Sequence, residues 1–157
     1  QQTPVSVEAL IQKAAEPLVI PMELREQSFL VQGDSSVQFT GDFAWSQEAV
    51  LNILKNCMEH TPFGGCIQVS FLGNAIFTEI IIEDNGPGFA KEDLPHLFER
   101  FYKGKHASQQ SVGIGLALSR MIVSQQNGTL KAENRGKEGG ARFTLKFYHS
   151  GTPHGGD

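Results

Sequence analysis

The sequence predicts an α/β (α+β) two-layer sandwich, in which helices cover one face of a mixed, mostly antiparallel sheet. Two observations predict this class. Some stretches carry apolar residues at the spacing of a helix, and others alternate apolar with polar residues as half-buried strands do. The order in which these helices and strands follow one another implies a single layer of helices packed on a single sheet.

The first part of the chain is expected to hold a helix and two strands. Residues 5–15 have apolar positions at helical spacing, with Ser6 as the N-cap and Pro17 as the stop. Residues 25–40 alternate apolar and polar side chains on both sides of a turn at 33–36. This alternation is the pattern of a half-buried hairpin.

A long helix follows over about residues 45–60. Asp42 or Ser46 can cap its start, and the Pro and Gly residues of 61–65 end it.

The next strands, 67–72 and 75–84, are expected to pair across Gly73 and Asn74. The second is almost continuously apolar, so we place it at the centre of the sheet. Residues 85–112 are rich in Gly, Pro, Lys, Gln and Ser, with short helical pieces only near 92–102. A segment that long without regular structure is usually functional, often as a lid.

A final helix is predicted at 113–126, and strands at 129–134 and 141–148 complete the sheet. The apolar stripe of this helix consists of Ile114, Ala117, Leu118, Met121 and Ile122. Residues 1–148 then form one domain, and the Gly-, Pro- and His-rich residues 149–157 form a disordered tail.

Composition excludes several classes of protein. The chain has 157 residues, 39% of them hydrophobic, which is enough for the core of one domain. Its formal net charge of -4 offers no basic footprint for nucleic acid. Cys57 and Cys66 do not form a CxxC pair, so a metal-thiolate cluster or disulfide framework has little support, and a reducing cytoplasmic setting fits best. No apolar stretch is long enough to cross a bilayer. Because the chain opens with Gln1 rather than Met, we expect an excised fragment or a processed product, from which features of the whole protein such as a membrane anchor can be missing.

Two amides lie one turn apart on the long helix. Asn52 and Asn56 fall on the side opposite Val50 and Leu54. They can form an ordinary solvated polar face. However, Asn is a mediocre helix former, and its amide oxygen is a hard ligand suited to Mg²⁺.

The segment 83–89 follows the most apolar strand and contains Asp84, Gly86 and Gly88. One interpretation is a surface turn, since Asn-Gly and Pro-Gly are common turn dipeptides. The other is a base-binding site. A carboxylate at the exit of a buried strand can accept from an exocyclic amine, and glycines let a flat base lie against bare backbone.

Gly113 and Gly115 stand at the mouth of the last helix, where unpaired N–H groups and the helix dipole favour a phosphate. A flexible helix entry is the alternative.

Aromatic and cationic residues interleave at 97–105, where Arg100, Lys103 and Lys105 could offset the charge of a triphosphate. The same segment also reads as a short amphipathic helix that packs its phenylalanines on the core.

Taken in order, four segments resemble the four boxes of the histidine-kinase ATPase domain. This is the Bergerat fold of the GHKL superfamily, shared with gyrase, the Hsp90 chaperones and MutL. Residues 52–56 resemble the N box, 84–88 the G1 box, 98–102 the F box and 113–116 the G2 box. The resemblance covers about residues 5–148, and Gly140 is similar to the family's closing glycine motif.

The resemblance implies a site for ATP or ADP with Mg²⁺. Asn56 would be the Mg²⁺ ligand, Asp84 the partner of the adenine amine, and residues 99–112 the ATP lid. The full set of implied nucleotide-binding residues is Asn52, Asn56, Glu59, His60, Asp84, Gly86, Gly88, Phe89, Tyr102, Lys103, Lys105, Gly113, Ile114, Gly115 and Leu116.

The chain departs from the family pattern at three positions. Glu59 stands where many members carry Lys or Arg, which puts one phosphate contact in doubt. His60 stands where the family usually has an aromatic residue or His, so it is expected to pack against the nucleotide. It is not expected to be the phosphoacceptor, because a His at a helix end lacks a neighbouring acid that could orient it. Ser111 replaces a glycine that often opens the G2 motif.

The function implied is that of the ATP-binding catalytic domain of a bacterial sensor histidine kinase. It would transfer the γ-phosphate of ATP to a histidine on a helical hairpin domain of the same protein, which lies outside this chain. None of the histidines present is followed by Asp or Glu in a helical context, so autophosphorylation by the fragment alone is not expected.

The same resemblance implies a response regulator as partner and a full-length protein that is homodimeric and membrane-bound, with this domain in the cytoplasm. Two alternatives stay open. One is a serine kinase of the anti-sigma-factor type, with the same fold, and the other is a partner-binding module that no longer binds nucleotide.

Overall fold

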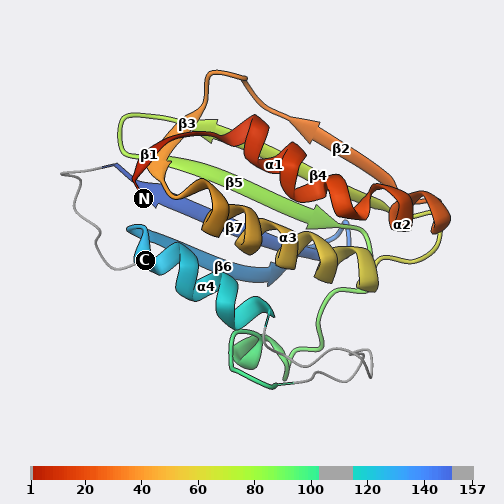
Figure 1. The fold of residues 1–157 in the computed structure, drawn as a ribbon. Helices are drawn as coiled ribbons and strands as arrows, with labels where there is room; N and C mark the ends of the chain where they lie inside the picture. Colours follow the sequence, from red (N-terminus) through yellow and green to blue (C-terminus); the bar gives the residue numbers. More distant parts are fainter. Residues whose placement is uncertain (1, 103–114, 150–157) are drawn as a thin grey trace.

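The computed structural model describes residues 2–102 and 115–149 (Figure 1). Its helices are α1 (Val7–Ala15), α2 (Val19–Leu24), α3 (Phe43–His60) and α4 (Gly115–Gln125), with 3₁₀ turns at Glu16–Leu18 and Leu94–His96. Its strands are β1 (Thr3–Ser6), β2 (Ser28–Gln32), β3 (Gln38–Gly41), β4 (Cys66–Gly73), β5 (Phe77–Asp84), β6 (Gly128–Asn134) and β7 (Ala141–Tyr148).

The fold is the predicted two-layer sandwich. A five-stranded sheet has the order β2-β4-β5-β7-β6, so the most apolar strand lies at its centre. The β2–β4 pair is parallel and the other neighbours are antiparallel. Helices α1, α3 and α4 lie together over one face of this sheet (Figure 1). None of the helices in the described ranges combines the length and apolar character that a membrane crossing requires.

The core lies between the helices and the sheet. Every second residue of β5 is buried, from Thr78 through Ile80 and Ile82 to Asp84. Aliphatic and aromatic side chains of the helices and neighbouring strands fill the rest of this layer, for example Leu10, Ile53 and Phe143. Asp84 is therefore the last residue of an otherwise uncharged inward-facing row.

Side-chain caps fix the ends of the helices. Ser6 accepts from the N–H of Ala9 at the start of α1, and Asp42, not Ser46, caps α3 by accepting from Trp45. At the other end of α3, the hydroxyl of Thr61 donates to the carbonyl of Cys57 over 2.6 Å, and Pro62 follows.

The turn between β4 and β5 is wider than predicted. Asn74 Oδ1 accepts from the N–H groups of Ile76 and Phe77, over 2.8 and 2.9 Å. The strand expected at 75–84 therefore begins at Phe77.

The hairpin predicted within residues 25–40 is wrong. Strand β2 pairs in parallel with β4, whereas β3 pairs antiparallel with β1. In the turn between β2 and β3, the carboxylate of Asp34 accepts from the N–H of Ser36, and the two strands then join different sheets. The alternation of apolar residues shows only which face of a strand is buried and does not identify its partner.

Two elements near the N-terminus were missed. Residues 3–6 form β1 before the helix predicted at 5–15 begins, and α2 follows the 3₁₀ turn that contains Pro17. Helix α2 is short, contains Pro21 and buries only Met22, so its sequence gives a weak helical signal. Its apolar residues Ile20 and Leu24 are 67% and 75% exposed.

The predicted stripe of the last helix is rotated. Met121 was expected on the buried face but is 50% exposed, whereas Ser119, Ile122 and Val123 are buried. The hydroxyl of Ser119 donates to the carbonyl of Ala49 over 2.8 Å, so a small polar residue lets α4 pack closely on α3.

Candidate functional site

The polar face of α3 meets the first residue of α4. Asn52 and Asn56 are half-buried on this face, whereas Glu59 is exposed. The amide Nδ2 of Asn52 donates to the carbonyl of Gly115 over 3.4 Å. A bond of that length adds little energy, but it shows that the two helices are in contact at these residues. The predicted metal-ligand helix and the predicted phosphate-binding helix therefore lie side by side.

Asn56 carries an unsatisfied atom. Its Oδ1 is buried and has no hydrogen-bond partner in the ranges that the structure describes. A buried acceptor without a partner costs roughly 1 to 3 kcal/mol. An amide oxygen in this state is suited to accept a cation or a donor from a ligand.

His60, one turn further along α3, is held by the backbone of Asn56. Its Nδ1 lies 2.8 Å from that carbonyl oxygen, and a carbonyl can only accept, so Nδ1 carries the proton and donates. In the neutral ring Nε2 is then the acceptor. The ring meets Phe89 edge-on, with ring centroids 6.1 Å apart. These contacts join the end of α3 to the segment that follows β5.

The carboxylate of Asp84 is held rigidly at the end of β5. Its side chain is buried, and Oδ1 accepts from the N–H of Gly86 over 3.0 Å and from the N–H of Ala141 over 3.1 Å. Burial raises the pKa of the Cys57 thiol on α3 well above its ordinary value, and the negative charge of Asp84 raises it further. Cys57 therefore stays a neutral thiol beside the charged group.

Gly86 and Gly88 are required by close contacts within the protein. A Cβ on Gly86 would lie 2.4 Å from the carbonyl oxygen of His60. Gly88 has a φ of +77°, and a Cβ there would lie 2.6 Å from Oδ1 of Asn134. From the sequence, these glycines are expected to let a base approach the backbone. The structure adds that they also let this segment approach α3 and β6.

The segment that contains Phe98 and Tyr102 packs on itself and on α4. The Tyr102 hydroxyl donates to the Asp93 carboxylate, which raises the pKa of Tyr102 to about 12. Its ring stacks on His96 at 5.0 Å, and the Arg120 guanidinium of α4 lies 5.0 Å from the Phe98 ring centroid. The hydroxyl of Tyr102 is thus used within the protein, and its contact with a nucleotide stays a prediction.

The remaining predicted residues divide between the described and the undescribed ranges. Leu116 is half-buried against the core. Lys103, Lys105, Gly113 and Ile114 lie outside the described residues.

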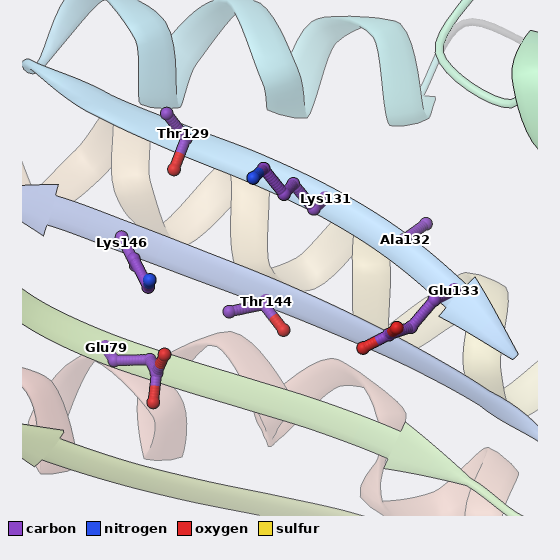
Figure 2. A pocket seen from close by; sticks show the side chains of 7 residues that line it. All are labelled: Glu79, Thr129, Lys131, Ala132, Glu133, Thr144 and Lys146. Atoms are coloured by element: carbon purple, nitrogen blue, oxygen red, sulfur yellow. The ribbon is translucent and has the colours of Figure 1, made fainter. Parts of the chain in front are cut away.

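A shallow pocket of about 220 Å³ lies on the opposite face of the sheet. It is lined by Glu79, Thr129, Lys131, Ala132, Glu133, Thr144 and Lys146, and Figure 2 shows these side chains on β5, β6 and β7. Successive side chains of a strand point to opposite faces, so Glu79 points away from the face that holds Asp84. The pocket is separate from the predicted site.

Most of the predicted residues that the structure describes thus lie along a series of contacts, whereas Glu59 and Tyr102 lie outside it. Asn52 touches Gly115, Asn56 holds His60, and His60 adjoins both Phe89 and Gly86. Gly86 donates to Asp84 and completes the series.

Residues 41–150, more than half of the chain, match the family described as histidine kinase-, DNA gyrase B-, and HSP90-like ATPase. The chain belongs to this ATPase family. The function of such a domain is to bind ATP.

Sequence relatives of this ATPase domain are sensor kinases. The chain is 33% identical over 146 residues to sensor protein SphS of Synechococcus elongatus, which covers 87% of this chain and 35% of SphS. It is 48% identical over 108 residues to sensor protein ChvG of Agrobacterium fabrum, covering 64% of this chain and 18% of ChvG. The chain thus spans about a third or less of the length of these relatives.

Solved structures agree with the ATPase fold. Mycobacterial sensor histidine kinase MprB superposes with a TM-score of 0.82 at 26% identity, covering 93% of this chain and 97% of that one. The catalytic domain of histidine kinase ThkA superposes with a TM-score of 0.84 at 19% identity, covering 94% of this chain and 95% of that one. The likeness to ThkA concerns the fold.

Three residues that hold the candidate site were not predicted from the sequence, and they lie in or next to β6 and β7. Asn134 bonds to Phe89, Arg135 to the carbonyl of Asp84, and Ala141 to the carboxylate of Asp84. Every alanine has a backbone N–H, so the sequence does not indicate which of them binds a carboxylate. The pair Asn134 and Arg135, before a glycine-rich turn, is only a weak signal of a functional contact.

Proposed function

We propose that this chain is the ATP-binding catalytic domain of a sensor histidine kinase. It binds Mg-ATP and delivers the γ-phosphate to a histidine on a helical hairpin domain that belongs to the same protein but lies outside this chain. Membership of the ATPase family and the sensor-kinase relatives support this proposal over the serine-kinase and nucleotide-free alternatives.

The contact between Asn52 and Gly115 is the observation that carries the proposal. It sets the polar face of α3 against the start of α4, where free N–H groups and the helix dipole favour phosphate. The buried carboxylate of Asp84 lies at the other end of the series of contacts. A nucleotide can therefore lie with its base at Asp84 and its phosphates between Asn52 and Gly115.

The base side of the site is assigned by hydrogen-bond chemistry. Both N–H bonds to the Asp84 carboxylate end on Oδ1, and we assign the second oxygen to the exocyclic amine of adenine. Phe89 and His60 form the adjoining wall, with Gly86 and Gly88 beneath. On the phosphate side we place Leu116 beside Gly115, with Gly113, Ile114, Lys103 and Lys105 as further contacts from outside the described residues.

The residues present fit a magnesium ion. Asn56 offers a buried amide oxygen without a partner among the described residues, and Mg²⁺ prefers such hard oxygen ligands together with phosphate oxygens and water. We therefore assign Asn56 as the Mg²⁺ ligand. When bound, the ion would offset part of the charge on the phosphates. Glu59 carries a negative charge where a cation would help, so we assign it no direct contact with phosphate.

The chemistry asked of this chain is positioning. Phosphoryl transfer needs an in-line nucleophile and charge stabilisation more than a general base. The attacking imidazole comes from the hairpin domain, and its lone pair displaces ADP from the γ-phosphorus. This chain holds the base, orients the phosphates and supplies cations. We therefore expect no autophosphorylation by the fragment alone.

The wider assembly is also part of the proposal. ThkA, which shares this fold at 18% identity, has been solved in complex with response regulator protein TrrA. We propose that the full-length protein is a membrane-bound homodimer that passes its phosphoryl group to a response regulator, with this domain on the cytoplasmic side.

Two measurements test the function. Isothermal titration of the chain with ADP and Mg²⁺ should show binding at micromolar to millimolar concentration, and no heat at millimolar ADP would leave only a partner-binding module. A phosphotransfer assay with radiolabelled ATP should then label a histidine-bearing hairpin but not a serine-bearing anti-sigma antagonist. Labelling of the serine protein alone would favour the serine kinase.

A further inference from the structure

The side chain of Asn134, the last residue of β6, forms hydrogen bonds with both backbone polar groups of Phe89, which lies in a distant segment. Its Oδ1 accepts from the N–H of Phe89 over 2.8 Å, and its Nδ2 donates to the carbonyl of Phe89 over 2.9 Å. Both hydrogen-bonding groups of one residue are thus paired with one side chain across 45 positions of sequence. The pairing imitates the way in which a neighbouring strand would hold Phe89.

The glycine before Phe89 leaves room for the side chain of Asn134. Gly88 has positive φ, and the Cβ of any other residue would lie 2.6 Å from Oδ1 of Asn134. Glycine at this position is therefore needed for the amide of Asn134 to reach the Phe89 peptide.

The next residue, Arg135, holds the other end of the same segment. Its Nη1 donates to the carbonyl of Asp84 over 2.9 Å and lies 3.3 Å from the carbonyl of Gly139. The last residue of β6 and the residue that follows it thus hold this part of the chain at Phe89 and at Asp84, the last residue of β5.

The hydrogen bonds from Asn134 hold the backbone of Phe89 and so help to set the position of its ring. The ring lies edge-on to His60 at 6.1 Å and to Phe143 at 5.9 Å. His60 is tied in turn to the Asn56 carbonyl. A shift of the Phe89 backbone would therefore move the Phe89 ring, which we place beside a bound base. It would leave the contact between Asn52 and Gly115, where we place the phosphates, unchanged.

We propose that Asn134 is a positioning residue that sets the adenine selectivity of the site by fixing the Phe89 peptide. The proposal rests on the nucleotide-binding function proposed above. Asn134 touches neither base nor phosphate. It acts through Phe89, so its loss weakens adenine nucleotides more than nucleotides that depend on phosphate contacts alone.

Asn74 offers a matched control. It is also exposed, and its side chain also makes two hydrogen bonds, of 2.8 and 2.9 Å, here to the backbone N–H groups of Ile76 and Phe77 in its own turn. It lies at the opposite end of β5 from Asp84. Asn74→Ala removes as many side-chain bonds as Asn134→Ala, but far from the proposed adenine pocket.

The experiment measures ADP and GDP affinity by isothermal titration, and melting temperature without ligand, for the wild type, Asn134→Ala, Asn134→Asp and Asn74→Ala. Asn134→Ala should weaken ADP roughly tenfold, the equivalent of about one net hydrogen bond, and GDP much less. Asn134→Asp keeps the acceptor for Phe89 N–H but loses the donor, so its ADP affinity should be intermediate. Asn74→Ala should bind ADP as the wild type does.

Each outcome separates the proposals. Wild-type ADP affinity in Asn134→Ala overturns the role of Asn134 and leaves the proposed function intact. An equal loss for ADP and GDP, accompanied by a lower melting temperature, shows a structural role only and also overturns it. Absence of ADP binding by the wild type overturns the proposed function and, with it, this inference.

Discussion

The backbone N–H of Ala141 donates to Oδ1 of Asp84 over 3.1 Å, and this bond links residues 57 positions apart in the chain. Gly86 donates to the same oxygen from the other side. The buried carboxylate is therefore fixed by its neighbours before any ligand binds. A group fixed in this way does not have to lose side-chain freedom on binding, which favours selective recognition.

Asp84→Asn should weaken ADP binding by roughly 1 to 3 kcal/mol, because the new amide presents N–H where the adenine amine also presents N–H. The retained Oδ1 can still accept from both backbone groups, so stability without ligand should change little. Isothermal titration with ADP measures the effect, and Glu79→Gln on the other face of β5 is the control. Equal affinity of the wild type for ADP and GDP would contradict this role for Asp84.

Asn56→Ala should abolish the Mg²⁺ dependence of ADP binding. Its Oδ1 makes no hydrogen bond among the described residues, so the substitution breaks no hydrogen bond of this oxygen there. The melting temperature without ligand should therefore stay close to that of the wild type. Titrations with Mg²⁺ and with EDTA measure the dependence, and Gln47→Ala on the same helix is the control. A clear drop in melting temperature would show that Asn56 is structural.

Gly88→Ala and Gly64→Ala separate backbone strain from steric conflict. Both glycines have positive φ, +77° and +79°, but a Cβ on Gly64 meets nothing within 4 Å. Gly64→Ala should cost about 1 to 2 kcal/mol of unfolding free energy from strain alone. Gly88→Ala should cost more and should also weaken ADP, because its Cβ displaces Asn134. Urea unfolding and titration test this, and equal costs for both variants would disprove the conflict with Asn134.

The buried thiol of Cys57 predicts a loss of stability at alkaline pH. Burial and the charge of Asp84 raise its pKa in the folded state, whereas in the unfolded chain the thiol titrates near its ordinary value of about 8.5. The folded state therefore binds more protons above that pH. The contribution is complete below the unfolded pKa and is lost as pH rises above it, by up to about 1.4 kcal/mol per pH unit.

Urea unfolding between about pH 8 and pH 9.5 measures this slope, in the range where the unfolded thiol titrates. Cys57→Ala should be less stable at neutral pH, since it leaves a small cavity, but should show a shallower decline with pH. Cys66→Ala, which changes the half-exposed thiol, should keep the wild-type slope. If both variants decline like the wild type, Cys57 does not carry the effect.

The sequence by itself determined the local elements and the residue types of the site. Helical spacing placed Asn52 and Asn56 on one face of α3, because the angle between successive residues of a helix is fixed. An apolar run that ended in Asp84 predicted a charged group at the end of the central strand. The caps at Ser6 and Asp42 followed from their side chains, since these act within one turn.

Only the tertiary structure decided which distant segments meet. The alternation of apolar residues did not show that strand β2 pairs with β4. The helical spacing of apolar residues in α4 did not show that Met121 lies outside the buried face. Neither pattern could show that Asn134 and Ala141 hold Phe89 and Asp84. Local patterns indicate which residues tend to be buried, whereas the neighbours of each residue, and the final orientation of a helix such as α4, depend on how the whole chain closes around one core.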